Sequence, residues 1–249
     1  MTHAHLVPFN HRCSPDDKYR YNRRLFEIVA PRYDRVTRLL SFCRDQAWKK
    51  RLVQLIPDME SPCIGDIACG TGDIARLCRA RFPSATITGI DLTLDMLRLA
   101  LRSACGPGTG YTAHNMDSLG IRAATFDVVT GGYALRNAPS LPDTLHEISR
   151  VLKPGGSALF LDFAKPDNPA HAYINLFFLE LWGTIFGIFF HRNRNVYAYI
   201  ARSLKKYPSR KRLADMAKRN GLRLRAAHGF FLGYIDILHF QKSARKSND

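Results

Sequence analysis

The chain has 249 residues, of which 46% are hydrophobic, and this size and composition favour a single domain with one full core. Its formal net charge of +16 and pI near 9.9 favour anionic partners, either nucleic acid or anionic lipid. The 6 cysteines are scattered without a C-x-x-C pair, which excludes a closely spaced zinc or disulfide framework and is typical of a reducing cytoplasm.

The N-terminal residues 1–20 contain no apolar stretch of the kind found in a secretory signal, and we expect them to form a flexible tail. We predict one domain over residues 21–242, followed by a second tail at 243–249. Within the domain, residues 21–56 have the apolar spacing of helices, with a break near Pro31.

A glycine-rich turn lies between Asp66 and Asp73, after a short apolar run and before an amphipathic one. This order predicts a strand, a tight turn and a helix. Gly70 and Gly72 have no Cβ, so the backbone can bend sharply and a ligand can lie against it. The turn also points the free amides of a helix N-terminus at the bound molecule. We therefore assign Asp66, Gly70 and Gly72 to a ligand site.

A second apolar run, residues 85–90, ends in Asp91, which lies 19 residues beyond Gly72. An acid at the tip of the second strand suits the two hydroxyls of a ribose. We place Leu92, the next residue, in the same site. The turn and the acid together predict a nucleoside ligand.

The nucleoside is not identified by spacing alone, since Gly70-x-Gly72-x-x-Ala75 also fits the dinucleotide fingerprint. Asp66 and Asp73 flank the turn with negative charge, which is unfavourable beside phosphates but suits a cationic ligand. S-adenosylmethionine carries a sulfonium and an ammonium group, so its charge matches. The other interpretation of Asp73 is an ordinary acid in the first turn of a helix.

Two later strand ends complete the predicted site. The short strand 111–114 ends in Asn115 and Met116, where a polar side chain can bond the adenine edge while the methionine packs on its face. A simple polar turn is the alternative. The buried strand 126–130 is followed by the loop 131–137, which should face the ligand because open α/β sheets bind ligands at the carboxyl ends of their strands.

Strands and helices alternate through a helix at 141–152 and a fifth strand at 157–163. This alternation predicts an α/β fold with a doubly wound, mostly parallel, Rossmann-like sheet. Two closing strands within 221–241 would bring the sheet to seven strands.

The pattern changes after Pro166. Residues 173–190 form an apolar run of eighteen residues with one charge, Glu180, at the edge of transmembrane length. The glutamate, two glycines and the lack of a second span favour two other interpretations. One is a buried core helix, and the other is an apolar lid over a greasy substrate, in contact with the bilayer. We define residues 167–206 as this helical lid segment.

Positive charge is concentrated in residues 192–225, which hold twelve Lys or Arg and a single acid, Asp215. We expect this segment to dock on an anionic membrane surface, so that the protein is cytoplasmic and peripheral on the inner face of the membrane. A solvated basic face is the alternative.

From Phe26 to Lys242 the chain resembles the class I S-adenosylmethionine-dependent methyltransferases and, more narrowly, the ubiquinone/menaquinone biosynthesis C-methyltransferase family. The most specific pieces are Leu135-Arg136-Asn137 and Asp162-Phe163-Ala164-Lys165-Pro166, which generic methyltransferases lack. The chain departs from the pattern where Ala68 replaces the first glycine of the turn. The other matching segments are Phe26 to Asp34 with Ser41 and Trp48, Arg150 to Gly156, Tyr197 to Ile200 with Ser203, Tyr207-Pro208, and Gly233 to Lys242.

The resemblance implies S-adenosylmethionine as the cofactor and a prenylated quinol as the substrate, methylated on a ring carbon in ubiquinone and/or menaquinone biosynthesis. No metal is needed for this chemistry. The family's donor contacts fall on Thr71, Asp91, Asn115, Met116 and Gly132, the last of which has no side chain to contribute.

The implied reaction needs an aromatic carbon to attack the sulfonium methyl, and the carbon is a better nucleophile when the adjacent hydroxyl is ionised. Arg136 is suited to stabilise that phenolate, but not to act as a base, because guanidinium stays protonated in proteins. Asn137 can orient the ring oxygen. Tyr33 can close over the site, although a tyrosine packed between helices is equally consistent with its position.

Three alternatives remain. A methyltransferase of the same family acting on a soluble phenol or polyketide is the first. A nucleic-acid methyltransferase is disfavoured because the loop 131–137 lacks an Asn/Asp-Pro-Pro-aromatic motif, so we expect no nucleic-acid partner. A non-catalytic binding protein is disfavoured by Asp91 and Arg136. The sequence leaves open which quinol is methylated and whether the chain forms a homodimer.

Overall fold

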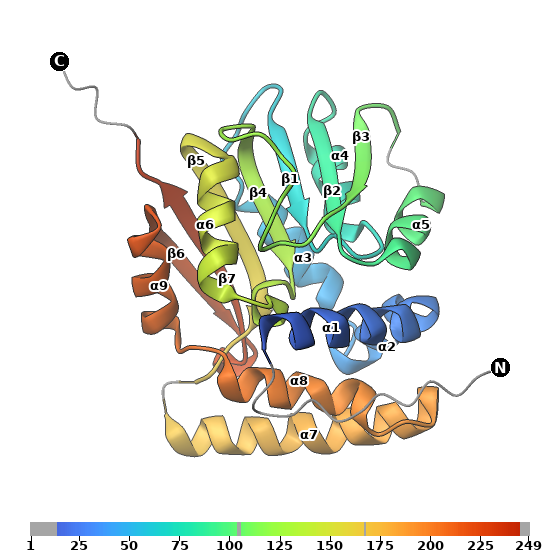
Figure 1. Cartoon of the computed structure of the whole chain (residues 1–249). Helices are drawn as coiled ribbons and strands as arrows, with labels where there is room; N and C mark the ends of the chain where they lie inside the picture. Colours follow the sequence, from blue (N-terminus) through green and yellow to red (C-terminus); the bar gives the residue numbers. More distant parts are fainter. Residues whose placement is uncertain (1–13, 104–105, 167, 245–249) are drawn as a thin grey trace.

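The computed structural model describes residues 14–103, 106–166 and 168–244. Its strands are β1 (Cys63–Ile67), β2 (Thr86–Asp91), β3 (Thr109–Ala113), β4 (Phe126–Gly132), β5 (Leu152–Phe163), β6 (Leu222–Phe230) and β7 (Ile235–Lys242). They form one sheet with the order β3-β2-β1-β4-β5-β7-β6 (Figure 1). The first five strands of that order are parallel, and β7 is antiparallel to both β5 and β6. The predicted doubly wound, mostly parallel, seven-stranded sheet is confirmed.

The helices of the described residues surround this sheet. They are α1 (Pro15–Val29), α2 (Tyr33–Leu40), α3 (Asp45–Gln54), α4 (Asp73–Arg81), α5 (Leu94–Arg102), α6 (Leu141–Val151), α7 (Pro169–His191), α8 (Asn195–Lys206) and α9 (Arg210–Arg219), with 3-10 turns η1 (Ala30–Arg32), η2 (Leu135–Asn137) and η3 (Phe231–Gly233).

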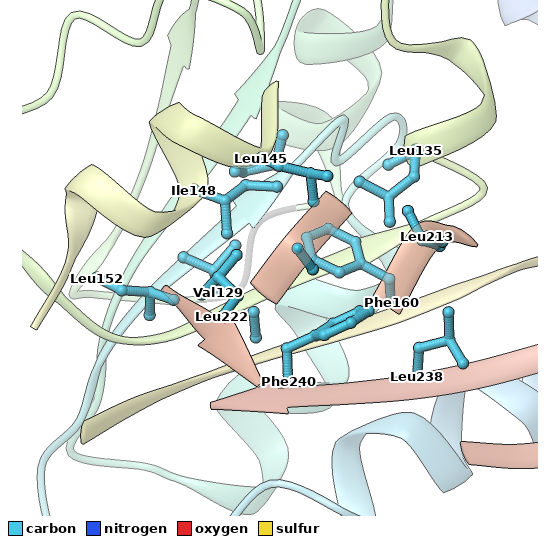
Figure 2. Close-up of a cluster of buried hydrophobic side chains, with 14 of the residues drawn as sticks. Val129, Leu135, Leu145, Ile148, Leu152, Phe160, Leu213, Leu222, Leu238 and Phe240 are labelled. Atoms are coloured by element: carbon cyan, nitrogen blue, oxygen red, sulfur yellow. The ribbon is translucent and has the colours of Figure 1, made fainter. Parts of the chain in front are cut away.

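Successive side chains of a strand point to opposite sides of the sheet, and helices cover both sides here, so the central strands are buried on both faces. Val129 of β4 packs with Leu145 and Ile148 of α6 on one face (Figure 2). Its neighbour Val128 packs with Ile74 of α4 on the other face. Helices therefore clamp the sheet from both sides and fix the positions of its strand ends.

The first helix begins earlier than predicted. Ser14 accepts a hydrogen bond from the Asp17 amide, and the Asp17 carboxylate accepts one from the Ser14 amide. This capping box and the proline at Pro15 start α1 inside the segment that we expected to be a tail. The rest of that predicted tail, residues 1–13, and residues 245–249 of the C-terminal one lie outside the described residues.

Two further boundaries differ from the sequence prediction. The second predicted helix is divided into α2 and α3 by a turn in which Phe42 and Cys43 have φ of 51° and 62°. Strand β5 begins at Leu152 rather than at 157, because Leu152 already pairs with Phe126 before the register shifts at the bulge.

Helices α7 and α8 pack against each other and form an outer layer beyond the carboxyl ends of the strands (Figure 1). The most apolar window of α7 is only 17% buried, so its interpretation as a buried core helix is wrong. Among the described residues, α7 is the one helix whose length and composition would also allow it to cross a membrane.

Candidate functional site

The carboxyl ends of β1, β2 and β4 enclose a small pocket of about 50 Å³. Of the cofactor residues predicted from the sequence, Gly70, Asp91, Leu92, Asn115, Met116 and Gly132 line it. Tyr33 and Asn137, predicted as catalytic, also line this pocket. The structure thus brings together residues that follow or end the four strands β1, β2, β3 and β4, and residues from the N-terminal helices.

The glycine turn has the strained backbone that its sequence predicts. Gly70 and Gly72 have φ of 54° and 81°, in the left-handed region that favours glycine. A Cβ on Gly72 would lie 2.8 Å from the hydroxyl oxygen of Tyr111. Ala68 also has a positive φ, 52°, which gives a physical reason for the glycine found at this position in many methyltransferases.

Asp91 holds the turn in place. Its Oδ2 accepts a hydrogen bond of 2.9 Å from the Gly70 amide, and its Oδ1 accepts one of 2.8 Å from the Thr93 amide. Burial raises the pKa of Asp91, while these backbone amides act in the opposite direction. The carboxylate therefore lies at the pocket wall with its orientation fixed.

Three predicted cofactor residues, Asp66, Thr71 and Gly72, do not line the small pocket. Asp66 is fully buried in β1, where it accepts a hydrogen bond of 2.8 Å from the Thr130 hydroxyl. Thr71 donates a 2.7 Å hydrogen bond to Asp34 of α2. The side chains of Asp66 and Thr71 point into the protein and support the turn, and Gly72 has no side chain.

The negative charge that we assigned to the turn is partly neutralised. Burial raises the pKa of Asp66 to about 7. Asp73 is compensated by Lys49, whose Nζ lies 2.7 Å from its Oδ2, and by an ion pair with Arg76. The two acids therefore place less negative charge beside the turn than the sequence alone indicated.

A second, larger pocket of about 340 Å³ lies between the sheet and the α7–α8 layer. Most of its lining is apolar, and the side chains come from both ends of the chain. The apolar lining includes Phe26, Leu39 and Phe42 from the N-terminal segment, Phe178 and Trp182 from α7, and Phe231 from η3.

The two pockets share a wall. Phe26, Tyr33, Tyr133 and Asn137 line both of them. Burial raises the pKa of Tyr33 and of Tyr133, so both phenols stay protonated and neither is a suitable general base. Because the two pockets share these four residues, a methyl group held in the small pocket would face the large pocket across this wall.

Arg136 lines the large pocket and belongs to a buried network. Its Nε lies 3.2 Å from Asp162 Oδ1, and its Nη1 donates to Ser203 Oγ at 3.0 Å and to Asn137 Oδ1 at 3.2 Å. The guanidinium also stacks over the ring of Phe163, 5.1 Å from its centroid. No hydrogen bond of Nη2 is recorded among the described residues, so this nitrogen can serve a ligand.

The η2 turn that carries Arg136 is tied to helices far away in the sequence. Asn22 of α1 donates to the Asn137 carbonyl at 2.6 Å and accepts from the Tyr199 hydroxyl at 2.7 Å. Lys18 donates to the Arg136 carbonyl at 3.2 Å, and burial, followed by repulsion from Arg136, lowers its pKa to about 8.

Sequence reasoning missed these supporting residues. Asp162 and Ser203 lie in the motifs that carry the family resemblance, and this was the only signal for them. No sequence motif pointed to Asn22 or Lys18, because both bind backbone carbonyls of the η2 turn. Asn22 lies 115 residues before its partner in the chain, and Lys18 lies 118 residues before its partner. The described residues contain no group of three or more His, Cys, Asp or Glu side chains able to hold a metal ion.

Known protein families provide an independent comparison. Residues 15–241 match the model of the ubiE/COQ5 methyltransferase family. The chain is 36% identical over 205 residues to the ubiquinone/menaquinone biosynthesis C-methyltransferase UbiE of Syntrophotalea carbinolica, covering 81% of this chain and 85% of the relative. It is 32% identical over 210 residues to the demethylmenaquinone methyltransferase of Thermotoga maritima, covering 84% and 90%.

Solved structures agree on the fold. A putative methyltransferase of Haloferax volcanii, solved in complex with the activator Trm112, has a TM-score of 0.66 at 15% identity and covers 88% of this chain and 97% of its own. A putative methyltransferase of Bacillus halodurans has a TM-score of 0.61 at 17% identity, with coverages of 79% and 99%. At these identities the likeness concerns the fold alone.

Proposed function

Because this chain belongs to the ubiE/COQ5 methyltransferase family, we propose that its small pocket holds the methyl donor and its large pocket a prenylated quinol. The chain is a methyltransferase that uses S-adenosylmethionine, and its reaction is C-methylation in ubiquinone and/or menaquinone biosynthesis. The observation that carries the assignment of the pockets is their shared wall, since methyl transfer requires donor and acceptor to meet in line.

On the donor side, Asp91 accepts hydrogen bonds from the ribose hydroxyls, and Asn115 and Met116 bind the adenine edge and face. Gly70, Leu92 and Gly132 provide close backbone contact, and a Cβ on Gly132 would lie only 2.9 Å from Ile74 Cδ1. The volume of about 50 Å³ is far below the range of roughly 300–1,000 Å³ that is usual for ligand sites. Binding of the donor therefore requires the wall formed by Phe26 and Tyr33 to move outward.

On the acceptor side, a ring carbon of the quinol attacks the methyl carbon of the sulfonium. The new carbon–carbon bond forms as the carbon–sulfur bond breaks, S-adenosylhomocysteine leaves, and the ring loses a proton to water or to a neighbouring group. Arg136 stabilises the phenolate that drives this attack through its Nη2, which makes no hydrogen bond within the described part of the chain.

Asn137 has a different role from the one that its motif suggested. Its Oδ1 accepts from Arg136, and its Nδ2 donates to the Tyr133 carbonyl at 2.8 Å. With both polar atoms engaged, Asn137 orients Arg136 rather than the ring oxygen, so it is a positioning residue. Tyr33, on the wall between the pockets, separates donor and acceptor from water.

The function is tested by supplying the purified protein with S-adenosylmethionine and reduced demethylmenaquinone, or the corresponding unmethylated ubiquinol precursor, and detecting the methylated quinol by mass spectrometry. A tail-free phenol is the matched control for the soluble-phenol alternative, and faster methylation of the tail-free compound would favour that alternative. In a strain lacking the chain, accumulation of the demethylated quinone identifies the natural acceptor.

We further propose a cytoplasmic enzyme that works at the inner face of the membrane, where a prenylated quinol resides. The basic segment 192–225 is not one surface, since it spans the buried helix α8 and the separate helix α9, which packs beside β6 (Figure 1).

A further inference from the structure

The outer side of α7 is apolar and faces solvent along its whole length. Its exposed side chains follow a helical spacing and do not line the large pocket; they include Phe177, Leu181, Ile185, Ile188 and Phe189, the last with 80% of its surface exposed. Contiguous exposed apolar surface of this kind marks an interaction site.

The mouth of the large pocket continues this apolar surface. Five of its lining residues are themselves exposed: Leu39, Phe42, Phe178, Trp182 and Phe231. Phe42 stacks on Phe231, with 6.1 Å between ring centroids, and so joins the α2–α3 turn to η3. The adjacent Leu232 is 88% exposed. Both the exposed apolar side chains around the mouth and the apolar pocket behind them are unfavourable surfaces for contact with water.

Exposed arginines flank the mouth residues Leu39 and Phe42 in the sequence. Arg35, Arg38 and Arg44, on and just after α2, are exposed, and no described carboxylate pairs with them. Arg192 and Arg194, also exposed, follow the end of α7. A hydrogen bond from Arg32 to the Phe190 carbonyl ties the start of α2 to that end of α7. The hydrogen bond brings the start of α2 beside the end of α7, and exposed arginines follow both points in the sequence.

The acids of this region do not cancel the charge. Asp34 accepts the hydrogen bond from Thr71, and Glu180 of α7 lies 3.4 Å from Lys205. The face therefore combines apolar side chains with excess positive charge, the combination that binds the headgroup and upper acyl regions of an anionic bilayer.

We propose that this face, made of the outer side of α7, the mouth of the large pocket and Arg35, Arg38 and Arg44, docks on an anionic lipid bilayer. The large pocket then opens directly into the acyl layer, and a lipid-borne quinol reaches Arg136 without crossing water. This route rests on the proposed function, whereas docking itself does not.

A second copy of the chain is a poorer occupant. A twofold interface through the same face would bring its unpaired arginines against those of the partner, which is unfavourable. An anionic lipid surface neutralises them instead. Exposed aromatic residues such as Trp182 and Phe177 are also typical of the membrane interface.

The test compares two triple variants. R35E/R38E/R44E changes the docking face, and K211E/R212E/K218E makes the same charge change on exposed positions of α9. Partitioning onto phosphatidylcholine vesicles containing phosphatidylglycerol should fall by on the order of 10²-fold in the first variant, from the contribution of each cation near an anionic surface. The α9 variant should lose far less, and pure phosphatidylcholine should bind every form weakly.

An uncharged pair, Phe177→Ser with Phe189→Ser, tests the apolar part, and its vesicle partitioning should fall by roughly tenfold. Both R35E/R38E/R44E and the Phe177→Ser, Phe189→Ser variant should methylate a tail-free quinol in solution at the wild-type rate. Both should methylate a long-chain quinol embedded in vesicles more slowly.

The proposal is overturned if the two triple variants lose vesicle binding equally, or if sedimentation shows that the α7 face is covered by a second copy. It is also overturned if the docking variants methylate the vesicle-borne quinol at the wild-type rate. A wild-type protein that binds vesicles but methylates neither quinol would instead contradict the proposed function and leave the docking face standing.

Discussion

The two pockets of this protein are built in different ways. The small pocket uses backbone turns and short polar side chains at strand ends, and the sheet core holds these ends from both sides. The large pocket is formed mainly by side chains of helices outside the sheet, from both ends of the chain. The strand-end side of the small pocket therefore has a locally encoded geometry, whereas its wall at Phe26 and Tyr33 and the whole large pocket depend on how α1, α2, α7 and α8 dock.

A buried carboxyl group supports each side, and the two differ in charge compensation. Asp66 lies behind the donor turn, with the Thr130 hydroxyl as a hydrogen-bond donor and no ion pair to a cation of the described residues. Asp162 lies beside the acceptor pocket and contacts Arg136. Burial raises the pKa of both acids, but at Asp162 the adjacent Arg136 guanidinium acts in the opposite direction and favours the charged form. The following predictions test this contrast.

The largest effect is expected on the acceptor side. Arg136→Ala should lower turnover by roughly 10²-fold or more, the scale of losing one transition-state donor, while affinity for S-adenosylmethionine stays nearly intact. Arg136→Lys should recover part of the rate, since a point charge cannot reproduce a planar guanidinium. Steady-state kinetics and donor calorimetry on one preparation measure both quantities.

Stability provides the control for this variant. Arg136→Ala leaves Asp162 buried without its partner and should also lower the melting temperature, whereas Arg136→Met combined with Asp162→Asn removes both charges and should restore it. Turnover should remain low in the double variant. If turnover recovers together with stability, Arg136 only supports the turn and has no role at the substrate.

The next effect concerns Asp66. Its pKa in the folded protein, about 7, lies above its ordinary value of 3.8, so between these values the folded state keeps a proton that the unfolded state has lost. Its contribution to stability is complete at low pH and decreases as pH rises through 7. The expected loss is about 2 kcal/mol between pH 5 and 7.

Urea unfolding of the wild type and Asp66→Asn at several pH values measures this contribution. The asparagine keeps an acceptor for Thr130 and cannot ionise, so the difference in unfolding free energy between the two proteins should change with pH. A constant difference would mean that Asp66 is already ionised in the folded protein.

A smaller effect is expected from Asp91→Ala, which should weaken S-adenosylmethionine binding by about 1.5 kcal/mol, or about tenfold, as expected for a charge-assisted hydrogen bond. The KM for the quinol should not change, because Asp91 lines only the small pocket. Asp91→Asn should have an intermediate effect, since it keeps one acceptor for the Gly70 and Thr93 amides. Unchanged donor affinity in a folded Asp91→Ala variant would remove Asp91 from the donor site.

The smallest effect is expected on the α7 side of the large pocket. Trp182→Ala should raise the KM for a prenylated quinol by roughly fivefold, through lost apolar contact with the tail. Trp182→Phe should nearly restore it, and donor affinity should be unaffected. If a tail-free quinol shows the same increase in KM, the tail does not lie against α7.

Much of the donor side could be predicted from the sequence. The spacing of Gly70, Gly72 and Asp91 indicates a strand, a turn and an acid at the next strand end, because such features depend on neighbouring residues and on the parallel sheet alone. The alternation of strands and helices along the chain likewise predicted a mostly parallel sheet of seven strands, because it too depends on local sequence patterns. Which side chains line the pocket was predicted less well, and Asp66, Thr71 and Gly72 lie behind it.

Other features depended on contacts between distant segments. The sequence could not show that Lys49 compensates Asp73, that Asn22 and Lys18 hold the Arg136 turn, or that Arg136 pairs with Asp162. The apolar run in α7 was identified from the sequence, but whether it is buried or exposed depends on what packs against it. In this protein α8 covers one side of α7 and leaves the other to solvent. Local sequence thus determined the sheet and the glycine turn, whereas long-range packing decided charge compensation, the shared wall and the exposed apolar face.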